Sequence, residues 1–169
     1  MSAAGPKRVF VSLGSNLGDR RAFLRTAHQD LSALAGTSVI AASQVYETAP
    51  QHLEDQPAFL NQVLCLETGL SPGELLAGCQ AVEDAAGRER GVRFGPRSVD
   101  VDILLFEDVT SDDPELTLPH PRMWQRAFVL APLAEIWSCG RGMPIVDVAA
   151  LAATLAETQQ IAVAGAADE

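Results

Sequence analysis

The sequence predicts an α+β protein, a ferredoxin-like βαββαβ sandwich with additional elements at its C-terminus. Three observations support this prediction: four segments have the apolar pattern of strands, two segments with capping residues have the pattern of helices, and their order is β-α-β-β-α-β. With 169 residues and a hydrophobic fraction of 47%, the chain can bury a core, and we expect one domain spanning residues 1–169.

The first predicted strand and helix lie near the N-terminus. Apolar residues alternate over residues 8–13, and this strand is expected to end at Gly14. The helix that follows is capped near Asp19, carries leucine and alanine along one face, and is expected to end at Gly36. Residues 38–48 are rich in β-forming side chains and predict the second strand.

A loop, a strand and a clearly marked helix follow. The prolines and charges of residues 49–58 predict a loop, and the apolar run of residues 59–70 predicts a strand. Ser71 and Glu74 form the pattern of a capping box, in which each side chain accepts a hydrogen bond from the other residue's backbone N–H. We expect this helix to run to about Ala86 and to stop at the glycine after it.

The last predicted strand, residues 98–106, completes the βαββαβ order. Beyond it we expect a short polar link over residues 116–136 and an alanine-rich helix near residues 146–157. The final segment, about residues 158–169, consists largely of small and polar side chains, so we expect a flexible tail there.

Composition and charge exclude several classes of protein. The net charge of −10 disfavours nucleic-acid binding, which rests on a positive surface. The sequence has no run of about 18 apolar residues and no signal-peptide pattern. The three cysteines form no CxxC pair, and we expect Cys65 and Cys79 to be core residues. We therefore expect a cytoplasmic monomer that binds small molecules, with no nucleic-acid or membrane partner.

Two aspartates, Asp100 and Asp102, lie inside the last predicted strand. Alternate residues of a strand share a face, so the two carboxylates point the same way, with Cα atoms about 6.8 Å apart. Such carboxylates repel each other unless one is protonated or a cation lies between them, and Mg²⁺ binds carboxylates together with water and phosphate oxygens. The alternative is a structural pair that is salt-bridged to Arg93 or Arg97 at an exposed strand start.

Arginines crowd the segment before these aspartates. Four of them lie within ten residues of an otherwise acidic chain: Arg88, Arg90, Arg93 and Arg97. This cluster indicates a phosphate site, and the alternative is a solvated loop. The stretch SLGSNLGDR follows a strand and precedes a helix, but it matches neither the Walker nor the dinucleotide glycine pattern. Its two glycines either shape the turn or let the backbone approach a ligand.

Phe59 and Asn61 suggest a second half of the site, because they share one face of their predicted strand. A ring beside an amide suits a planar heterocycle: the ring stacks and the amide hydrogen-bonds an edge. Thr48 and the loop after it could supply further polar contacts. The alternative for Phe59 is ordinary core packing.

A third polar group follows the last predicted strand. His120 lies between two prolines, which make it a rigid loop residue that is more often exposed or facing a ligand than buried. Arg122 and Arg126 are one turn apart if their segment is helical, so both could face the same anion.

Five blocks between residue 9 and about residue 137 resemble one family in the same order: SLGSNLGDR, VYETAP, DQPAFLNQV, GRERGVRFGPRSVDVDILLF and LPHPRMWQRAFVLAPLAEI. The chain resembles the 6-hydroxymethyl-7,8-dihydropterin pyrophosphokinases, folate-pathway enzymes that transfer diphosphate from ATP to a pterin alcohol. The resemblance implies that ATP and 6-hydroxymethyl-7,8-dihydropterin are the substrates. It also implies Mg²⁺ as cofactor, as two ions that bridge the phosphates and the pterin hydroxyl.

The resemblance implies four overlapping sets of site residues. The metal ligands are Asp100 and Asp102. The ATP contacts are Glu83, Arg88, Arg90, Arg97, His120 and Arg126. The pterin contacts are Thr48, Pro50, Phe59, Asn61 and Phe128. The residues implied in catalysis are Arg88, Arg97, Asp100 and Asp102.

The chain departs from the family pattern at a few positions. Ala49 stands where proline can occur, Phe94 where tryptophan can occur, and Phe59 keeps a ring where relatives can carry tyrosine. Glu115 replaces a basic residue that some members use near the nucleotide. These departures imply a less stiff loop, a changed loop contact and one fewer phosphate contact.

Rival interpretations are a βαββαβ module that binds RNA, a regulatory module that binds a small molecule, and an inactive member of the family. An RNA-binding module needs aromatic and basic residues on its sheet face, where this chain carries paired aspartates. A regulatory module does not need paired carboxylates beside arginines. An inactive member is disfavoured because the metal and arginine positions are intact.

Overall fold

The computed structural model describes residues 5–48, 58–87 and 98–165. Within these ranges six strands form one sheet in the order β5-β1-β4-β3-β8, and β2 also pairs with β4. Every strand pair in the sheet is antiparallel. The strands are β1 (Lys7–Ser15), β2 (Thr37–Ala42), β3 (Val45–Thr48), β4 (Phe59–Thr68), β5 (Asp100–Phe106) and β8 (Ile161–Gly165). The prediction of a mixed α+β protein is confirmed.

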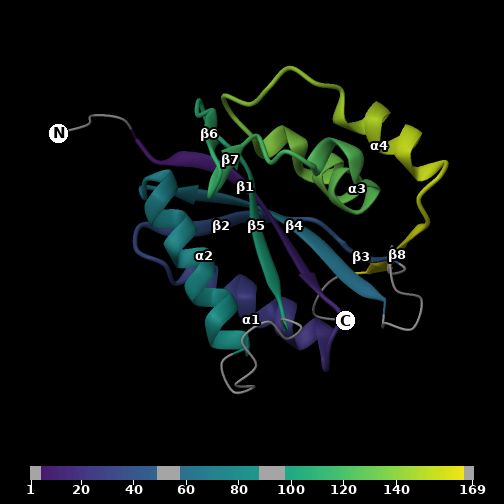
Figure 1. Ribbon diagram of the computed structural model, residues 1–169, viewed down its shortest axis with the longest axis horizontal. Coiled ribbons are helices and arrows are strands. Elements are labelled where there is room, and N and C mark those ends of the chain that lie inside the picture. Colours follow the sequence, from purple (N-terminus) through teal and green to yellow (C-terminus); the bar gives the residue numbers. More distant parts are fainter. Residues whose placement is uncertain (1–4, 49–57, 88–97, 166–169) are drawn as a thin grey trace.

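Helices cover both faces of this sheet (Figure 1). One face packs against α1 (Arg20–Ser32) and α2 (Pro72–Gly87). The other face packs against α3 (Ala127–Ile136), and α4 (Val148–Ala156) packs against α3. No helix in the described ranges combines the length and the apolar character that crossing a membrane requires. Cys65 and Cys79 are buried free thiols, as predicted.

Capping residues begin the helices where the sequence predicts. The Asp19 carboxylate accepts a hydrogen bond from the backbone N–H of Ala22 at 3.0 Å, at the first turn of α1. At α2, the N–H of Glu74 donates to Ser71 Oγ at 3.2 Å, and the N–H of Ser71 donates to Glu74 Oε1 at 2.9 Å. The predicted capping box is therefore confirmed.

The two faces of the central strands differ in chemistry. Val9, Val11 and Leu13 of β1 point into the core beneath α1 and α2. Phe10 points into the second core beneath α3. Ser12 and Gly14 lie on the same face, further toward the end of the strand. The α3 face is therefore apolar where the helix covers it and polar at one end, and that end holds the predicted site.

The expected single strand over residues 38–48 is two strands, β2 and β3. The break falls at Ser43, whose side-chain oxygen accepts from the N–H of Val63 at 3.0 Å, and whose carbonyl accepts from Gln62 Nε2 at 2.9 Å. Because the Ser43 side chain pairs with the N–H of Val63 here, the chain changes direction while that buried backbone group stays hydrogen-bonded.

The expected polar link over residues 116–136 is wrong for most of its length. It contains β7 (Leu116–Leu118), which pairs with β6 (Ser111–Asp113), a 3-10 turn at Met123–Gln125, and the buried helix α3. Nearly every residue of α3 is apolar and Pro132 lies inside it, so no amphipathic period marks it as a helix.

The expected flexible tail over residues 158–169 is wrong for residues 161–165. This segment is β8, which pairs with β3 at the edge of the sheet. The guanidinium of Arg21 on α1 also donates to the carbonyl oxygen of Ala164. Backbone pairing at a sheet edge does not require a strong apolar pattern. The small side chains of β8 therefore gave no pattern from which a strand could be predicted.

Glu107 anchors the end of β5 and predicts a pH-dependent stability. Its burial favours the neutral acid, but hydrogen bonds from the N–H of Arg8 (2.8 Å) and from Arg141 Nε (3.0 Å), with the charges of Arg141 and Lys7, lower the pKa of the carboxyl below its ordinary 4.5. The stabilisation that Glu107 provides is therefore present above pH 4.5 and is lost as the pH falls through the lower pKa of the folded state.

We expect the Glu107→Gln variant to be about 1.5 kcal/mol less stable than wild type at pH 7. Urea unfolding from pH 7 to pH 3 should show this gap shrink, and a constant gap would contradict the assignment.

Candidate active site

Strand register brings four site-face residues into one row across the sheet. Tyr46 on β3 pairs with Asn61 on β4, Asn61 pairs with Gly14 on β1, and Gly14 pairs with Asp100 on β5. Directly paired residues project to the same face. The row therefore runs from the predicted pterin contact Asn61 to the predicted metal ligand Asp100.

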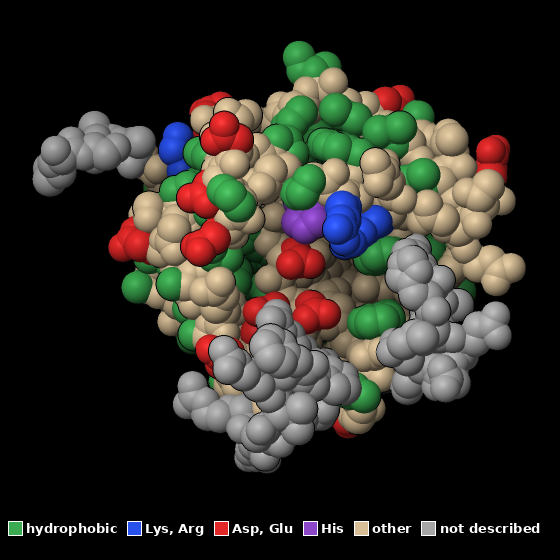
Figure 2. Space-filling view, in the orientation of Figure 1, with side chains coloured by type: hydrophobic (Ala, Val, Ile, Leu, Met, Phe, Trp, Pro, Cys, Tyr) green, Lys and Arg blue, Asp and Glu red, His purple; other side chains and the backbone are tan. Residues whose placement is uncertain are grey.

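A second row lies beside the first, one step closer to α3. It joins Val63, Ser12 and Asp102 across β4, β1 and β5. The two aspartates are both partly exposed, while Val101 between them is buried on the opposite face. The prediction that the carboxylates share a face of the strand is therefore confirmed. Figure 2 shows a hollow on one face of the molecule with Asp and Glu side chains in it and His and Lys or Arg side chains at its rim.

Gly14 separates the two halves of the site. It lies inside β1 rather than after it, which corrects the predicted end of this strand. A Cβ at this position would lie 3.2 Å from Asn61 Oδ1, a tight contact, and 3.9 Å from Phe59 Cδ1, an ordinary one, so any side chain would crowd the predicted pterin contact Asn61. Gly18, by contrast, has a left-handed φ of 62° and shapes the turn before α1.

Asn61 and Thr48 form a buried polar pair at the β3–β4 end of the row. Their exposed fractions are 6% and 7%, and Asn61 Nδ2 donates to Thr48 Oγ1 at 3.0 Å. Phe59 pairs with Thr48 at the last step of the β3–β4 ladder and is partly exposed. Because Thr48 holds the amide nitrogen, the orientation of the Asn61 amide is fixed, with its oxygen beside Gly14.

A third carboxylate lies beside the two aspartates. Glu83 on α2 accepts a hydrogen bond from the backbone N–H of Val101 at 2.8 Å, and Val101 lies between Asp100 and Asp102. β5 is an edge strand, so its outer N–H groups are available to a side chain. Burial raises the pKa of the nearby Cys79 thiol to about 12, and the negative charges of Glu83 and Asp102 add to this effect.

The two carboxylates of Asp100 and Asp102 fit a magnesium ion whose remaining ligands come from water and from the phosphate oxygens of a bound substrate. Within the described ranges, no three or more His, Cys, Asp or Glu side chains are grouped so that they could hold a metal ion. Asp100 and Asp102 offer hard oxygen donors at a partly exposed position, with a glycine and a serine beside them on β1. Mg²⁺ typically takes one or two carboxylates and completes its shell with water and phosphate oxygens.

His120 is half-buried and lies within electrostatic reach of Asp102, Arg122 and Arg126. Its N–H donates to the carbonyl of Leu104 at 2.9 Å, and its Nδ1 accepts from the N–H of Arg122 at 3.2 Å. Burial lowers the pKa of His120, the charge of Asp102 opposes this, and the charges of Arg126 and Arg122 reinforce it. The imidazole is therefore neutral near pH 7, which suits a ring nitrogen that accepts a hydrogen bond.

Arg126 and Phe128 meet at the start of α3. The guanidinium carbon of Arg126 lies 5.5 Å from the centre of the Phe128 ring, which is the geometry of a cation–π contact. Arg122 and Arg126 flank the 3-10 turn that precedes α3 rather than lying in one α-helix, yet both act on His120. Arg126, a predicted ATP contact, and Phe128, a predicted pterin contact, are thus in direct contact with each other.

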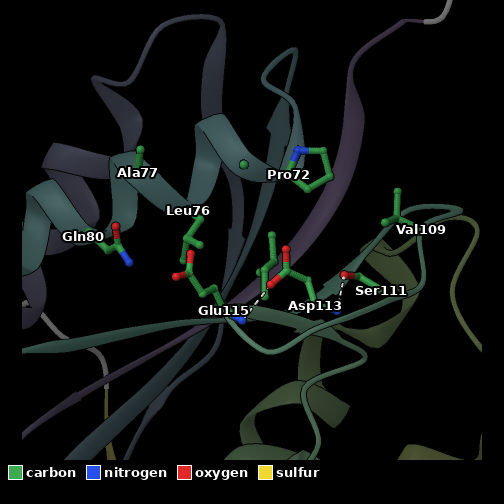
Figure 3. Close-up of a pocket in the computed structure, with 10 residues that line it drawn as sticks. Pro72, Leu76, Ala77, Gln80, Val109, Ser111, Asp113 and Glu115 are labelled. Carbon is green, nitrogen blue, oxygen red and sulfur yellow. Dashed lines mark hydrogen bonds between the residues drawn. The ribbon is translucent and has the colours of Figure 1, made fainter.

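A cavity of about 510 Å³ lies between α2 and the β6–β7 hairpin (Figure 3). Gln80 on its wall is one helical turn before Glu83, so this wall and Glu83 lie on neighbouring positions of α2. Asp113 accepts from the N–H of Glu115 at 2.9 Å and donates its own N–H to Ser111 Oγ at 3.2 Å. The cavity is lined by Pro72, Gly73, Leu76, Ala77, Gln80, Val109, Ser111, Asp113, Glu115 and Leu116.

Several predicted site residues lie outside the described residues, and their roles remain predictions: Pro50, Arg88, Arg90 and Arg97, with Ala49 and Phe94 among the departures. The cavity escaped the sequence reasoning, whereas the role of Gly14 was left open between shaping the turn and letting the backbone approach a ligand. The glycine at position 14 had a usable signal, because a glycine inside a strand pattern often marks a close approach by another group. The cavity had no signal in the sequence, because its walls come from α2 and the β6–β7 hairpin and meet only in the folded chain.

Comparison with known proteins gives a consistent result. The family model for 7,8-dihydro-6-hydroxymethylpterin-pyrophosphokinase matches residues 10–138. A 2-amino-4-hydroxy-6-hydroxymethyldihydropteridine pyrophosphokinase of Bacillus subtilis is 49% identical over 128 residues, covering 76% of this chain and 77% of that protein. A Pseudomonas aeruginosa protein of the same name is 45% identical over 130 residues, covering 77% and 80%.

A solved structure supports the fold. The chain superposes on wild-type Plasmodium falciparum HPPK-DHPS with a TM-score of 0.69 at 14% identity. The match covers 92% of this chain but only 46% of that one, so this chain spans less than half of the longer protein.

Proposed function

Because this chain belongs to the 7,8-dihydro-6-hydroxymethylpterin-pyrophosphokinase family, we propose that it transfers diphosphate from ATP to 6-hydroxymethyl-7,8-dihydropterin in folate synthesis. The products are the pterin diphosphate and AMP. The observation that carries the proposal is the row across β3, β4, β1 and β5. It joins a buried amide suited to a heterocycle to a carboxylate suited to a phosphate-bound cation, with only a glycine between them.

The amide end of the row is proposed to bind the pterin. Thr48 and Asn61 present fixed polar groups that can hydrogen-bond the edge of a planar heterocycle. Phe59 at the start of β4 and Phe128 at the start of α3 supply rings that can stack on its faces. Pro50 is proposed as a further pterin contact from the family resemblance.

The carboxylate end is proposed to bind two Mg²⁺ ions, held by Asp100 and Asp102. When bound, Mg²⁺ would neutralise charge on the phosphate oxygens of ATP. His120 and Arg126, whose charges act on each other, are proposed to contact the same phosphates, and so are Arg88, Arg90 and Arg97 from the family resemblance. Glu83 holds the backbone between the aspartates and so orients both of them.

The cavity between α2 and the β6–β7 hairpin is proposed to take the adenosine part of ATP. Its volume and its partly apolar wall suit a base and a ribose. Asp113 and Glu115 on its rim would repel phosphates, which favours an orientation with the phosphates directed toward His120 and Arg126.

In the proposed reaction the hydroxymethyl oxygen of the pterin attacks the β-phosphorus of ATP. A bond forms between these two atoms, the bond from the β-phosphorus to the oxygen bridging it to the α-phosphate breaks, and AMP leaves with that oxygen. The hydroxyl proton is released. The residues of this chain act by holding the two substrates in line and by placing positive charge near the phosphate oxygens, the main sources of catalysis in phosphoryl transfer.

Two finer statements accompany this proposal. We infer that β5, β1 and β4, with β2 and β3 beside β4, form the strand order of a ferredoxin-like sheet that β8 extends. We also propose that the chain acts as a monomer. A binding module without catalysis is not favoured, since the relatives are named as pyrophosphokinases.

The proposed function is tested by AMP release from ATP and Mg²⁺ with and without 6-hydroxymethyl-7,8-dihydropterin. We expect AMP only when the pterin is present, and we expect EDTA to abolish its release. AMP release that does not depend on the pterin would indicate a different acceptor. No AMP under either condition would overturn the proposal.

A further inference from the structure

Arg20, the first residue of α1, contacts both β3 and the residue that immediately precedes β4. Its Nη1 donates to Glu47 Oε2 at 2.9 Å and to the carbonyl oxygen of Ala58 at 2.7 Å. Glu47 lies at the end of β3, and Ala58 lies just before β4. One guanidinium nitrogen therefore joins the chain on either side of residues 49–57.

The two residues that Arg20 holds are chain neighbours of predicted pterin contacts. Glu47 precedes Thr48, and Ala58 precedes Phe59. Thr48 and Phe59 pair with each other at the last step of the β3–β4 ladder. Pairs near the end of a ladder open more readily than those at its centre, and this is the last β3–β4 pair among the described residues. Thr48 also pairs with Ile161 of β8 on its other side. Arg20 therefore contacts the chain neighbours of both members of this pair.

Arg20 acts from the opposite face of the sheet. Glu47 pairs with Leu60, which is buried in the core beneath α1 and α2, whereas Thr48 and Asn61 project to the α3 face. The guanidinium is therefore separated by the sheet from any ligand in the row. Its influence on a ligand must pass through the backbone of β3 and β4.

The start of α1 is itself held in place. Asp19 caps the helix through the N–H of Ala22, and Gly18 shapes the turn before it. These contacts give a physical role to Gly18, Asp19 and Arg20, the last three residues of the SLGSNLGDR stretch. The proposed function assigns none of these three a direct contact with a ligand. The stretch fixes a helix start from which an arginine reaches two strands.

We propose that Arg20 is a positioning residue for the pterin half of the site, and this inference rests on the proposed function. It sets the position of Thr48 and Phe59 relative to Asn61. An exposed ion pair alone contributes little to stability, and the Arg20 side chain is 29% exposed and that of Glu47 is 45% exposed. The effect of removing it should therefore appear mainly in pterin binding.

The chain contains a closely matched control, Arg8. Its side chain is 26% exposed, its Nε lies 3.0 Å from Glu67 Oε2, and its Nη1 donates to the carbonyl oxygen of Cys139 at 2.7 Å. Arg8 thus makes the same kinds of contact as Arg20, but at the opposite end of the β1–β4 pair. Removing either side chain should cost similar stability, and only Arg20 should affect the pterin.

The experiment compares the full-length Arg20→Met and Arg8→Met variants with wild type. We measure the KM for pterin, the KM for ATP and the melting temperature. We also measure the Kd of 6-hydroxymethyl-7,8-dihydropterin by fluorescence with Mg²⁺ and a non-hydrolysable ATP analogue. For Arg20→Met we expect the pterin KM and Kd to rise about tenfold with little change in the ATP KM, because small misplacements of binding groups are costly. Arg20→Lys, which keeps a cationic donor, should recover part of the loss.

The outcomes separate this inference from the proposed function. Pterin constants within twofold of wild type in an active Arg20→Met variant would overturn the inference and leave the function standing. An equal rise in Arg8→Met would also overturn it, because a general loss of stability would then explain both. If the wild type neither releases AMP nor binds the pterin, both the function and the inference fail.

Discussion

Replacing Asp102 with asparagine is expected to lower the rate of pterin-dependent AMP release about a thousandfold, which corresponds to about 4 kcal/mol of transition-state stabilisation. The Asp102 carboxylate is a partly exposed hard donor in the second row, opposite Ser12. The amide of asparagine is a much weaker ligand for Mg²⁺ than a carboxylate. The fold should persist, because the substitution keeps the shape of the side chain and buries no new group.

The matched control for this variant is Asp108→Asn. Asp108 follows the same strand, its carboxylate is 66% exposed, and it lies 3.9 Å from Lys7 in a weak surface ion pair. Its φ of 57° is one that asparagine adopts readily, so the control should fold normally. We expect Asp108→Asn to retain the wild-type rate. A wild-type rate in Asp102→Asn would remove this carboxylate from the mechanism.

Replacing Asn61 with alanine is expected to lower kcat/KM for the pterin about a hundredfold while leaving the KM for ATP nearly unchanged. The substitution removes the amide that is proposed to hydrogen-bond the pterin, and two lost hydrogen bonds of about 1.5 kcal/mol each account for this factor. It also leaves the buried Thr48 hydroxyl without the donor that now lies 3.0 Å away. Steady-state kinetics with each substrate varied in turn measures the effect.

Thr68→Ala provides the control for Asn61→Ala. Thr68 is fully buried on the same strand, its Oγ1 lies 2.7 Å from Thr37 Oγ1, and it accepts the N–H of Leu70 at 3.1 Å. It lies at the far end of β4 from the row. We expect a lower melting temperature and unchanged pterin kinetics. If the two variants lose pterin kcat/KM equally, Asn61 has no specific role in binding.

Local signals predicted much of the fold correctly. The capping residues Asp19, Ser71 and Glu74 act where they were expected, because a cap depends on only a few neighbouring residues. The alternation of Asp100 and Asp102 with buried neighbours also predicted their common face, because side chains in any strand alternate. These inferences needed no knowledge of which strands pair.

The wrong predictions concern elements whose existence depends on distant partners. Helix α3 is apolar on nearly every side because it lies between the sheet and α4, so it has no amphipathic pattern to read. Strand β8 is weakly patterned and forms by pairing with the edge of β3. The break between β2 and β3 depends on Ser43 meeting Val63 on another strand.

The sequence by itself determined the α+β class, the helix starts, the shared face of the two aspartates and the pairing of a ring with an amide at Phe59 and Asn61. Only the tertiary structure decided that these two halves lie in one row across Gly14, and that Arg20 joins β3 to β4 from behind the sheet. The physical reason is register. Alternation along a strand follows from local geometry, but the residue that stands opposite on the next strand is set by pairing across the whole sheet.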